Sequence, residues 1–179
     1  QDGAAYSLQG VYALAEDHDG QIWVGTPIGV FVVTHPEEWF DPDFYITQIK
    51  VPRNDGTNYA DYLLNGEVIT AIAVDGANRK WIGTEKNGIY LVSADGVEII
   101  HHFTTDNSPL ISNYIYSIAP NMETGEIMIG TEIGLVSYQS EASAPAENLN
   151  EDHLKVYPNP VRPEYHGDIT LTGLTADAD

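Results

Sequence analysis

The chain of 179 residues is long enough for one domain and part of a second, and 42% of its residues are hydrophobic. Its 27 acidic and 7 basic residues give a formal net charge of −20, which disfavours nucleic acid and anionic membranes as general partners. Cysteine is absent, which excludes disulfides and thiol catalysis, and no apolar run approaches the roughly 20 residues of a membrane-spanning helix.

The first predicted unit covers about residues 8–52 and consists of short apolar segments separated by turns. Strands are expected over "YALAED" (12–17), "QIWVG" (21–25), "VFVV" (30–33) and "YITQIKV" (45–51). The Asp-Gly pair between the first two segments supplies the positive φ that tight hairpins require. Short strands that are apolar nearly throughout are typical of a sheet buried on both faces.

The same pattern returns over about 66–105, with a fourth strand expected at 98–104, and again over about 113–138. The shared positions are Trp23 and Trp81, the pairs Gly25-Thr26, Gly83-Thr84 and Gly130-Thr131, and an acid six residues before each Trp. The third copy has Met128 in place of the Trp and lacks an obvious fourth strand. Repeats of this length indicate β-propeller blades, in which Trp and Gly pack neighbouring sheets together. The predicted fold is therefore all-β, a partial β-propeller of about three four-stranded antiparallel blades within residues 1–140.

The segment "FTTDNSPLISNYIYSIA" (103–119), followed by the Gly-Thr pattern, resembles the two-component-regulator type propeller repeat of Bacteroidetes surface and periplasmic proteins. The resemblance covers residues 8–138 and implies an exported protein at the cell surface or in the periplasm. Closed propellers have about four to eight blades. We therefore expect this chain to be incomplete without the rest of the propeller.

The C-terminal part has a different composition. Residues 141–153 are expected to be a linker, and 154–179 the truncated beginning of a β-sandwich-like domain. "VYPNPVRP" (156–163) resembles the opening of C-terminal domains found in the type IX secretion system. Together with the repeat, this implies a non-catalytic envelope module for cargo attachment, whose partners are secretion proteins and anionic lipopolysaccharide. The alternative is a glycan-sensing ectodomain of a hybrid two-component histidine kinase.

No motif for catalysis is found. A nucleophile elbow and a phosphate-binding glycine loop are both missing, so an enzyme is not expected. The turn with Asp17 and Asp19 resembles a calcium loop, but the later acidic ligand of that motif is absent. No cofactor or metal is therefore expected, with Ca²⁺ as the one ion that this turn suggests.

Two surface segments are candidates for binding. On one rim of the predicted propeller, Arg53 and Lys86 would provide positive charge for a ligand, and Tyr59 and Tyr62 would stack on sugar rings; an ordinary long surface loop is the alternative. The opposite rim carries "THPEEWFDPDF" (34–44) with the adjacent aromatic residues Trp39 and Phe40. Exposed aromatics of this kind favour a protein contact, unless the pair folds back as a local core.

Overall fold

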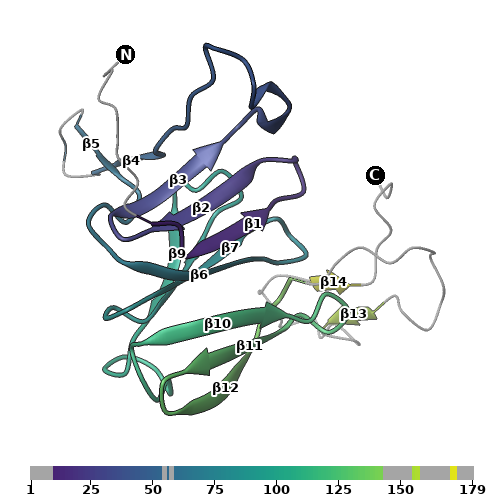
Figure 1. Cartoon of the computed structure of the whole chain (residues 1–179). Helices are drawn as coiled ribbons and strands as arrows, with labels where there is room; N and C mark the ends of the chain where they lie inside the picture. The colour runs from purple at the N-terminus through teal and green to yellow at the C-terminus, as the bar shows by residue number, and fades with distance from the viewer. Residues whose placement is uncertain (1–9, 54–55, 57–58, 143–154, 158–169, 173–179) are drawn as a thin grey trace.

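The computed structural model describes residues 10–53, 56, 59–142, 155–157 and 170–172, and strands dominate this part of the chain (Figure 1). Blade 1 contains β1 (Ala13–Glu16), β2 (Ile22–Thr26) and β3 (Gly29–Val33). Blade 2 contains β6 (Ile69–Val74), β7 (Lys80–Thr84), β8 (Ile89–Val92) and β9 (Ile99–Phe103). Blade 3 contains β10 (Ile115–Pro120), β11 (Glu126–Thr131) and β12 (Gly134–Gln139). Each blade is an antiparallel sheet whose strands follow chain order. The expected all-β, blade-like architecture is confirmed.

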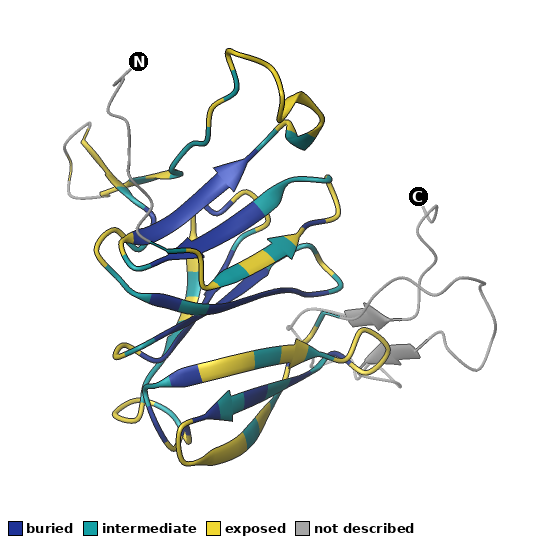
Figure 2. Ribbon diagram, viewed as in Figure 1, coloured by how far each residue is buried: buried dark blue, intermediate teal, exposed yellow. Residues whose placement is uncertain are grey.

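The blades are arranged side by side through their first strands. β6 lies between β1 and β10, so the three first strands form the inner edge of the arc (Figure 1). The buried residues concentrate in the sheets of blades 1 and 2, where β3, β7 and β8 are buried throughout (Figure 2). This is the burial expected of strands that are covered on both faces.

Blade 1 departs from the prediction at its fourth strand. Within residues 45–51, Thr47 forms a single bridge with Val32. The chain then leaves the sheet, because β4 (Lys50–Pro52) pairs with β5 (Ala60–Tyr62). This hairpin places Leu63, 1% exposed, in the core between blades 1 and 2. The fourth strand is therefore replaced by a hairpin that buries an additional apolar side chain. The predicted fourth strand of blade 2 is confirmed as β9.

The repeated Trp residues lie between blades, as predicted. Trp23 packs in a cluster that includes Ile72 and Val92 of blade 2, and Trp81 packs in one that includes Ile115 and Ile127 of blade 3. Both Trp side chains are almost completely buried. Each indole therefore joins two consecutive sheets in a shared apolar cluster.

Glycine allows the close approach of these sheets. A Cβ atom on Gly25 would lie 2.7 Å from Cγ2 of Ile69 on the next blade, and one on Gly83 would lie 2.6 Å from Cγ2 of Ile115. Carbon atoms do not approach so closely without displacing their neighbours. Both contacts cross from one blade to the next, which explains the Gly of the first two copies.

The end of the chain is described only in part. No fourth strand of blade 3 is found among the described residues, which end at 142 in this part of the chain. Residues 143–153 of the predicted linker lie outside the described part. In the predicted second domain, β13 (Lys155–Tyr157) pairs antiparallel with β14 (Thr170–Thr172).

A short 3-10 helix, η1 (Pro36–Glu38), interrupts the loop after β3. No helix in the described ranges is long and apolar enough to cross a membrane.

Candidate functional site

The Asp17 turn, considered above for calcium, makes a set of hydrogen bonds within the protein. Oδ1 of Asp17 accepts from the backbone N–H groups of Asp19 (3.0 Å) and Gln21 (2.9 Å). Oδ2 accepts from Nε1 of Trp23 at 2.9 Å and lies 3.0 Å from Nζ of Lys80. Both oxygens are engaged by these donors, which gives the carboxylate a structural role in the blade.

Lys80 of blade 2 is the partner that sequence analysis missed. Its side chain is 0% exposed, and its ammonium lies 4.7 Å from the centre of the Trp23 ring. It also donates to the backbone carbonyls of Asn78 (2.8 Å) and Ala94 (2.5 Å). The sequence did contain a signal for this contact. Lys80 directly precedes Trp81, at a strand position where the first copy has the apolar residue Ile22.

The other two copies contain variants of this hydrogen-bonded turn. In blade 2, Oδ2 of Asp75 accepts from Nε1 of Trp81 (3.2 Å) and Nε of Arg79 (2.8 Å). In blade 3, Met128 has no indole N–H, and the turn acid is replaced by Asn121, whose Oδ1 accepts from two backbone N–H groups. The acid six residues before the Trp therefore serves as its hydrogen-bond acceptor.

Two of the predicted ligand-binding residues line one hollow of about 570 Å³ beside the β4–β5 hairpin. Arg53 and Tyr62 lie on its wall together with Asp61, Leu64 and Ile99. The Arg53 guanidinium binds both carboxylate oxygens of Asp61, with Nε–Oδ2 at 2.9 Å and Nη2–Oδ1 at 2.5 Å. This bidentate pair fixes the orientation of the guanidinium at the rim of the hollow.

The other two predicted residues are placed differently. Tyr59 is 70% exposed, and its backbone carbonyl accepts from the Arg53 N–H at 3.2 Å. Lys86 lies in the turn between β7 and β8, outside the wall of that hollow, with its Nζ 3.8 Å from Oε2 of Glu85. The structure therefore brings Arg53, Tyr59 and Tyr62 together on one hairpin and leaves Lys86 on a separate turn.

Trp39 and Phe40 follow η1 on the loop after β3. Phe40 is 95% exposed and Trp39 is 58% exposed. The Trp39 ring packs against Phe44, with ring centroids 4.9 Å apart. One face of Trp39 therefore folds back locally, while Phe40 and most of Trp39 remain available at the surface.

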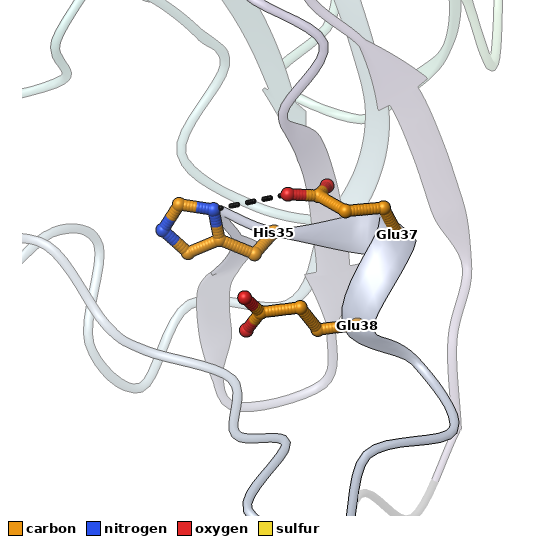
Figure 3. Close-up of side chains that lie close together, drawn as sticks. All are labelled: His35, Glu37 and Glu38. Atoms are coloured by element: carbon orange, nitrogen blue, oxygen red, sulfur yellow. Dashed lines mark hydrogen bonds and ion pairs between the residues drawn. The ribbon is translucent and has the colours of Figure 1, made fainter.

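The same loop gathers three metal-type ligands. Single ligand atoms of His35, Glu37 and Glu38 lie within 4.8 Å of one another, and His35 Nδ1 is 3.3 Å from Oε1 of Glu37 (Figure 3). All three side chains are exposed. Groups of exposed acids are expected on a chain of this net charge, and nothing else in this loop indicates an ion.

A second hollow of about 480 Å³, here called the tyrosine hollow, was not found from the sequence. Its walls contain Tyr12, Pro27, Val68, Thr70, Glu85, Tyr114 and Tyr116. The repeat did contain a signal for this hollow, because Tyr12, Thr70 and Tyr116 occupy the same position in the three copies. In each copy this residue directly precedes the strand partner of the repeated Gly.

Comparison with known proteins gives two kinds of match. The family model of the two component regulator propeller matches residues 6–27, whereas no curated protein matches the sequence. Among solved structures, PorZ, described as an essential surface component of the type-IX secretion system of Porphyromonas gingivalis, is 36% identical, with a TM-score of 0.73. That match covers 97% of this chain and 23% of PorZ, so the chain spans about a quarter of its relative.

Extracellular domains of two-component and one-component systems are also similar. The extracellular domain of a hybrid two-component system from B. thetaiotaomicron is 25% identical, with a TM-score of 0.55. The match covers 78% of this chain and 17% of that domain. The extracellular domain of a one-component system from the same organism has a TM-score of 0.57 at 20% identity, a likeness of fold alone.

Proposed function

The chain is a PorZ-like propeller of the two component regulator type, and from this likeness we propose that it is a non-catalytic binding and assembly module of type IX secretion. Its place is the cell surface or the periplasm, where it would contact other envelope proteins during attachment of secreted cargo. The observation that carries this proposal is the 36% identity to PorZ along 97% of the chain.

Deletion of the gene in its host tests this role. Cargo proteins should then fail to become attached at the cell surface, and they should accumulate unattached in the periplasm or the medium. Immunoblots of cell-surface, periplasmic and medium fractions measure this distribution, and reintroduction of the gene should restore it. Normal surface attachment of cargo in the deletion strain would overturn the assignment to type IX secretion.

The proposed ligand is anionic lipopolysaccharide, bound at the β4–β5 hairpin. Arg53 provides a planar fork suited to phosphate or carboxylate, and Tyr59 and Tyr62 provide rings for sugars. Asp61 engages the Nε and Nη2 nitrogens of this fork, so an anionic group has to share or displace that carboxylate. Lys86, on its separate turn, adds positive charge to an otherwise acidic surface.

Binding of host lipopolysaccharide to the complete protein, measured by isothermal titration calorimetry, tests this ligand. Arg53→Gln should weaken binding about tenfold, because it removes a charge-assisted contact. Lys50→Gln is the matched control, since Lys50 is on the same hairpin but outside the wall of the hollow. Equal affinities of the two variants, or no binding with and without Ca²⁺, would refute the ligand.

Glycan sensing in a hybrid histidine kinase is the second candidate. It is supported by the match to the extracellular domain of a hybrid two-component system over 78% of the chain. Deletion of the gene should then abolish transcription of glycan-utilisation genes in response to one glycan while leaving cargo attachment intact. RNA sequencing of the same deletion strain during growth on single glycans distinguishes the two candidates.

A further inference from the structure

The tyrosine hollow is formed by three blades at the inner edge of the arc. Tyr12 precedes β1 of blade 1, Thr70 lies in β6 of blade 2, and Tyr116 lies in β10 of blade 3. Because β6 lies between β1 and β10, side chains from residues far apart in the sequence meet at one place (Figure 1). A hollow that needs three blades is a feature of the assembled arc, which a single repeat cannot provide.

The first strands carry bulges at the hollow. The pairing of β6 with β7 shifts between Ile69 and Ala71, so Thr70 is the extra residue. The pairing of β10 with β11 shifts in the same way around Tyr116. A bulge re-aims the side chain of its extra residue and is frequent beside binding sites. The position that lines the hollow is thus released from the regular ladder in both blades.

Aromatic rings dominate the wall on the side of blade 3. The rings of Tyr114 and Tyr116 are tilted by 55° with centroids 4.8 Å apart. Tyr116 and Tyr12 are each 59% exposed, so ring surface from two blades is open to solvent. Ring faces of tyrosine carry partial negative charge and attract cations.

One carboxylate adds full negative charge at the same place. Glu85 lies on the wall, and its backbone N–H donates to the Val68 carbonyl at 3.0 Å. The pKa of Tyr114 is raised, first by loss of hydration and then by the negative charge of Glu85, with smaller effects from Tyr116 and Glu132. Acidic groups from blades 2 and 3 therefore act on one ring.

We propose that the tyrosine hollow binds an organic cation, an alkylammonium or guanidinium group held between the tyrosine rings and Glu85. The protein already places one such group nearby, since the Lys86 ammonium lies 3.8 Å from Oε2 of Glu85. That lysine side chain is 80% exposed, and water screens a pair of this kind strongly. An incoming cation that also contacts the rings gains the additional ring–cation attraction.

The charge of the hollow decides against other ligand classes. A neutral sugar would stack on the rings and donate hydroxyl hydrogen bonds to Glu85 but would lack the attraction between full charges, and an anionic lipid headgroup would be repelled by Glu85. This inference goes beyond the proposed function and concerns different residues from the Arg53 hairpin. The cation can be a free small molecule or a basic side chain of a partner protein, because both present the same group.

The test compares charged and uncharged probes of equal shape on the complete protein. Choline should bind and shift the tyrosine ring signals in NMR spectra, and it should bind at least about threefold more tightly than its neutral isostere 3,3-dimethylbutan-1-ol. The amides of N-acetyl-lysine and N-acetyl-arginine form the second arm. Choline binding indicates a free ion, and binding restricted to the amino-acid amides indicates a side chain of a partner.

Variants locate the site. Glu85→Gln and Tyr116→Leu should each weaken choline binding about two- to fivefold, whereas Tyr45→Leu, at a residue 66% exposed on another loop, should not. Thermal melting of each variant verifies that the fold is retained. Lys86→Gln should strengthen choline binding because it removes the competing ammonium, and it should weaken the lipopolysaccharide binding proposed at the β4–β5 hairpin.

Three outcomes would overturn the proposal: no binding of any of the three cations, equal binding of choline and its neutral isostere, or binding that Glu85→Gln leaves unchanged. Loss of lipopolysaccharide binding in the Arg53→Gln variant has no bearing on the tyrosine hollow, so the two proposals fail separately.

Discussion

At the scale of single residues, the pair formed by Asp17 and Lys80 links blade 1 to blade 2. Both side chains are at most 1% exposed. A buried ion pair is costly to desolvate, and it is tolerated only when further hydrogen bonds satisfy both groups. Asp17 has those bonds from two backbone N–H groups and an indole, and Lys80 has them from two carbonyls. The pair therefore ties the first turn of blade 1 to β7 of blade 2.

Asp17→Asn should destabilise the protein by about 3–5 kcal/mol, because it leaves the Lys80 ammonium buried without its counter-ion. Lys80→Met should cost less, since Asp17 keeps three N–H donors. The double variant should cost less than the two single variants together. Urea unfolding followed by tryptophan fluorescence measures all three, and additive costs would show that the two groups do not interact.

The same carboxylate makes stability depend on pH. Burial alone would raise the pKa of Asp17, but hydrogen bonds from Lys80, Trp23 and Gln21 together lower it below its ordinary value of 3.8. Its contribution is therefore fully present above that value and is lost as the pH falls through the lowered value. The difference in stability between the wild type and Asp17→Asn should be constant from about pH 7 to 5 and shrink in more acidic solution.

The sequence alone predicted part of this arrangement. The spacing of six residues between acid and Trp was visible, because both lie in one hairpin. The contact with Lys80 was not, because it joins residues of different repeats and depends on how the sheets face each other. The ion pair between Arg53 and Asp61 was not predicted either, because it depends on the β4–β5 hairpin, which replaced a predicted strand.

At the scale of elements, the distance between adjacent sheets depends on the Gly that follows the Trp. Gly25→Ala should destabilise the protein by about 1–3 kcal/mol, because its Cβ atom would press on Ile69, a residue 0% exposed that cannot move aside. Gly83→Ala should act similarly against Ile115. The midpoint of urea unfolding measures both changes.

Gly130→Ala is the matched control. A Cβ atom there would meet the hydroxyl oxygen of Ser117 at 2.5 Å, the end of a side chain that can rotate, on the same blade. The cost should therefore stay below that of Gly25→Ala. Equal costs at the two positions would mean that the glycines serve their own strands and not the contact between sheets.

The strands themselves were the most predictable elements. Hairpins are local, and their turns and apolar segments were visible in each copy, so β2, β3 and β7 to β9 lie where the repeats predicted them. The loss of the fourth strand in blade 1 was not predictable from local pattern. It depends on Leu63, which joins a core formed by residues of both blades.

At the scale of the whole molecule, the outer blades keep large apolar side chains exposed. Leu14 on β1 and Leu135 on β12 are 64% and 63% exposed. In closed propellers of about four to eight blades, such faces pack against adjoining sheets. The tyrosine hollow is likewise a property of the whole molecule, because the arrangement of the blades brings its residues together. The β-bulges at Thr70 and Tyr116 could not be predicted from the periodicity of the sequence.

The loop after β3 lies apart from these sheet faces and carries exposed aromatic residues. Phe40 is 95% exposed and is flanked by acids, so it contributes little to folding while offering a large apolar contact. Aromatic anchors of this kind dominate the energy of many protein interfaces. Replacement of Phe40 by a photoreactive benzoyl-phenylalanine should leave thermal stability unchanged, and irradiation of living host cells should cross-link the protein to a type IX secretion component.

The same photoreactive residue at Tyr45, 66% exposed on the same loop, is the control and should give little of that product. Mass spectrometry of the cross-linked species identifies the partner and the position of contact. Trp39 should behave like Phe40, because its ring packs on Phe44 with one face while more than half of its surface stays open. Equal cross-linking from positions 40 and 45 would indicate chance encounters, and the aromatic pair would then have no specific partner.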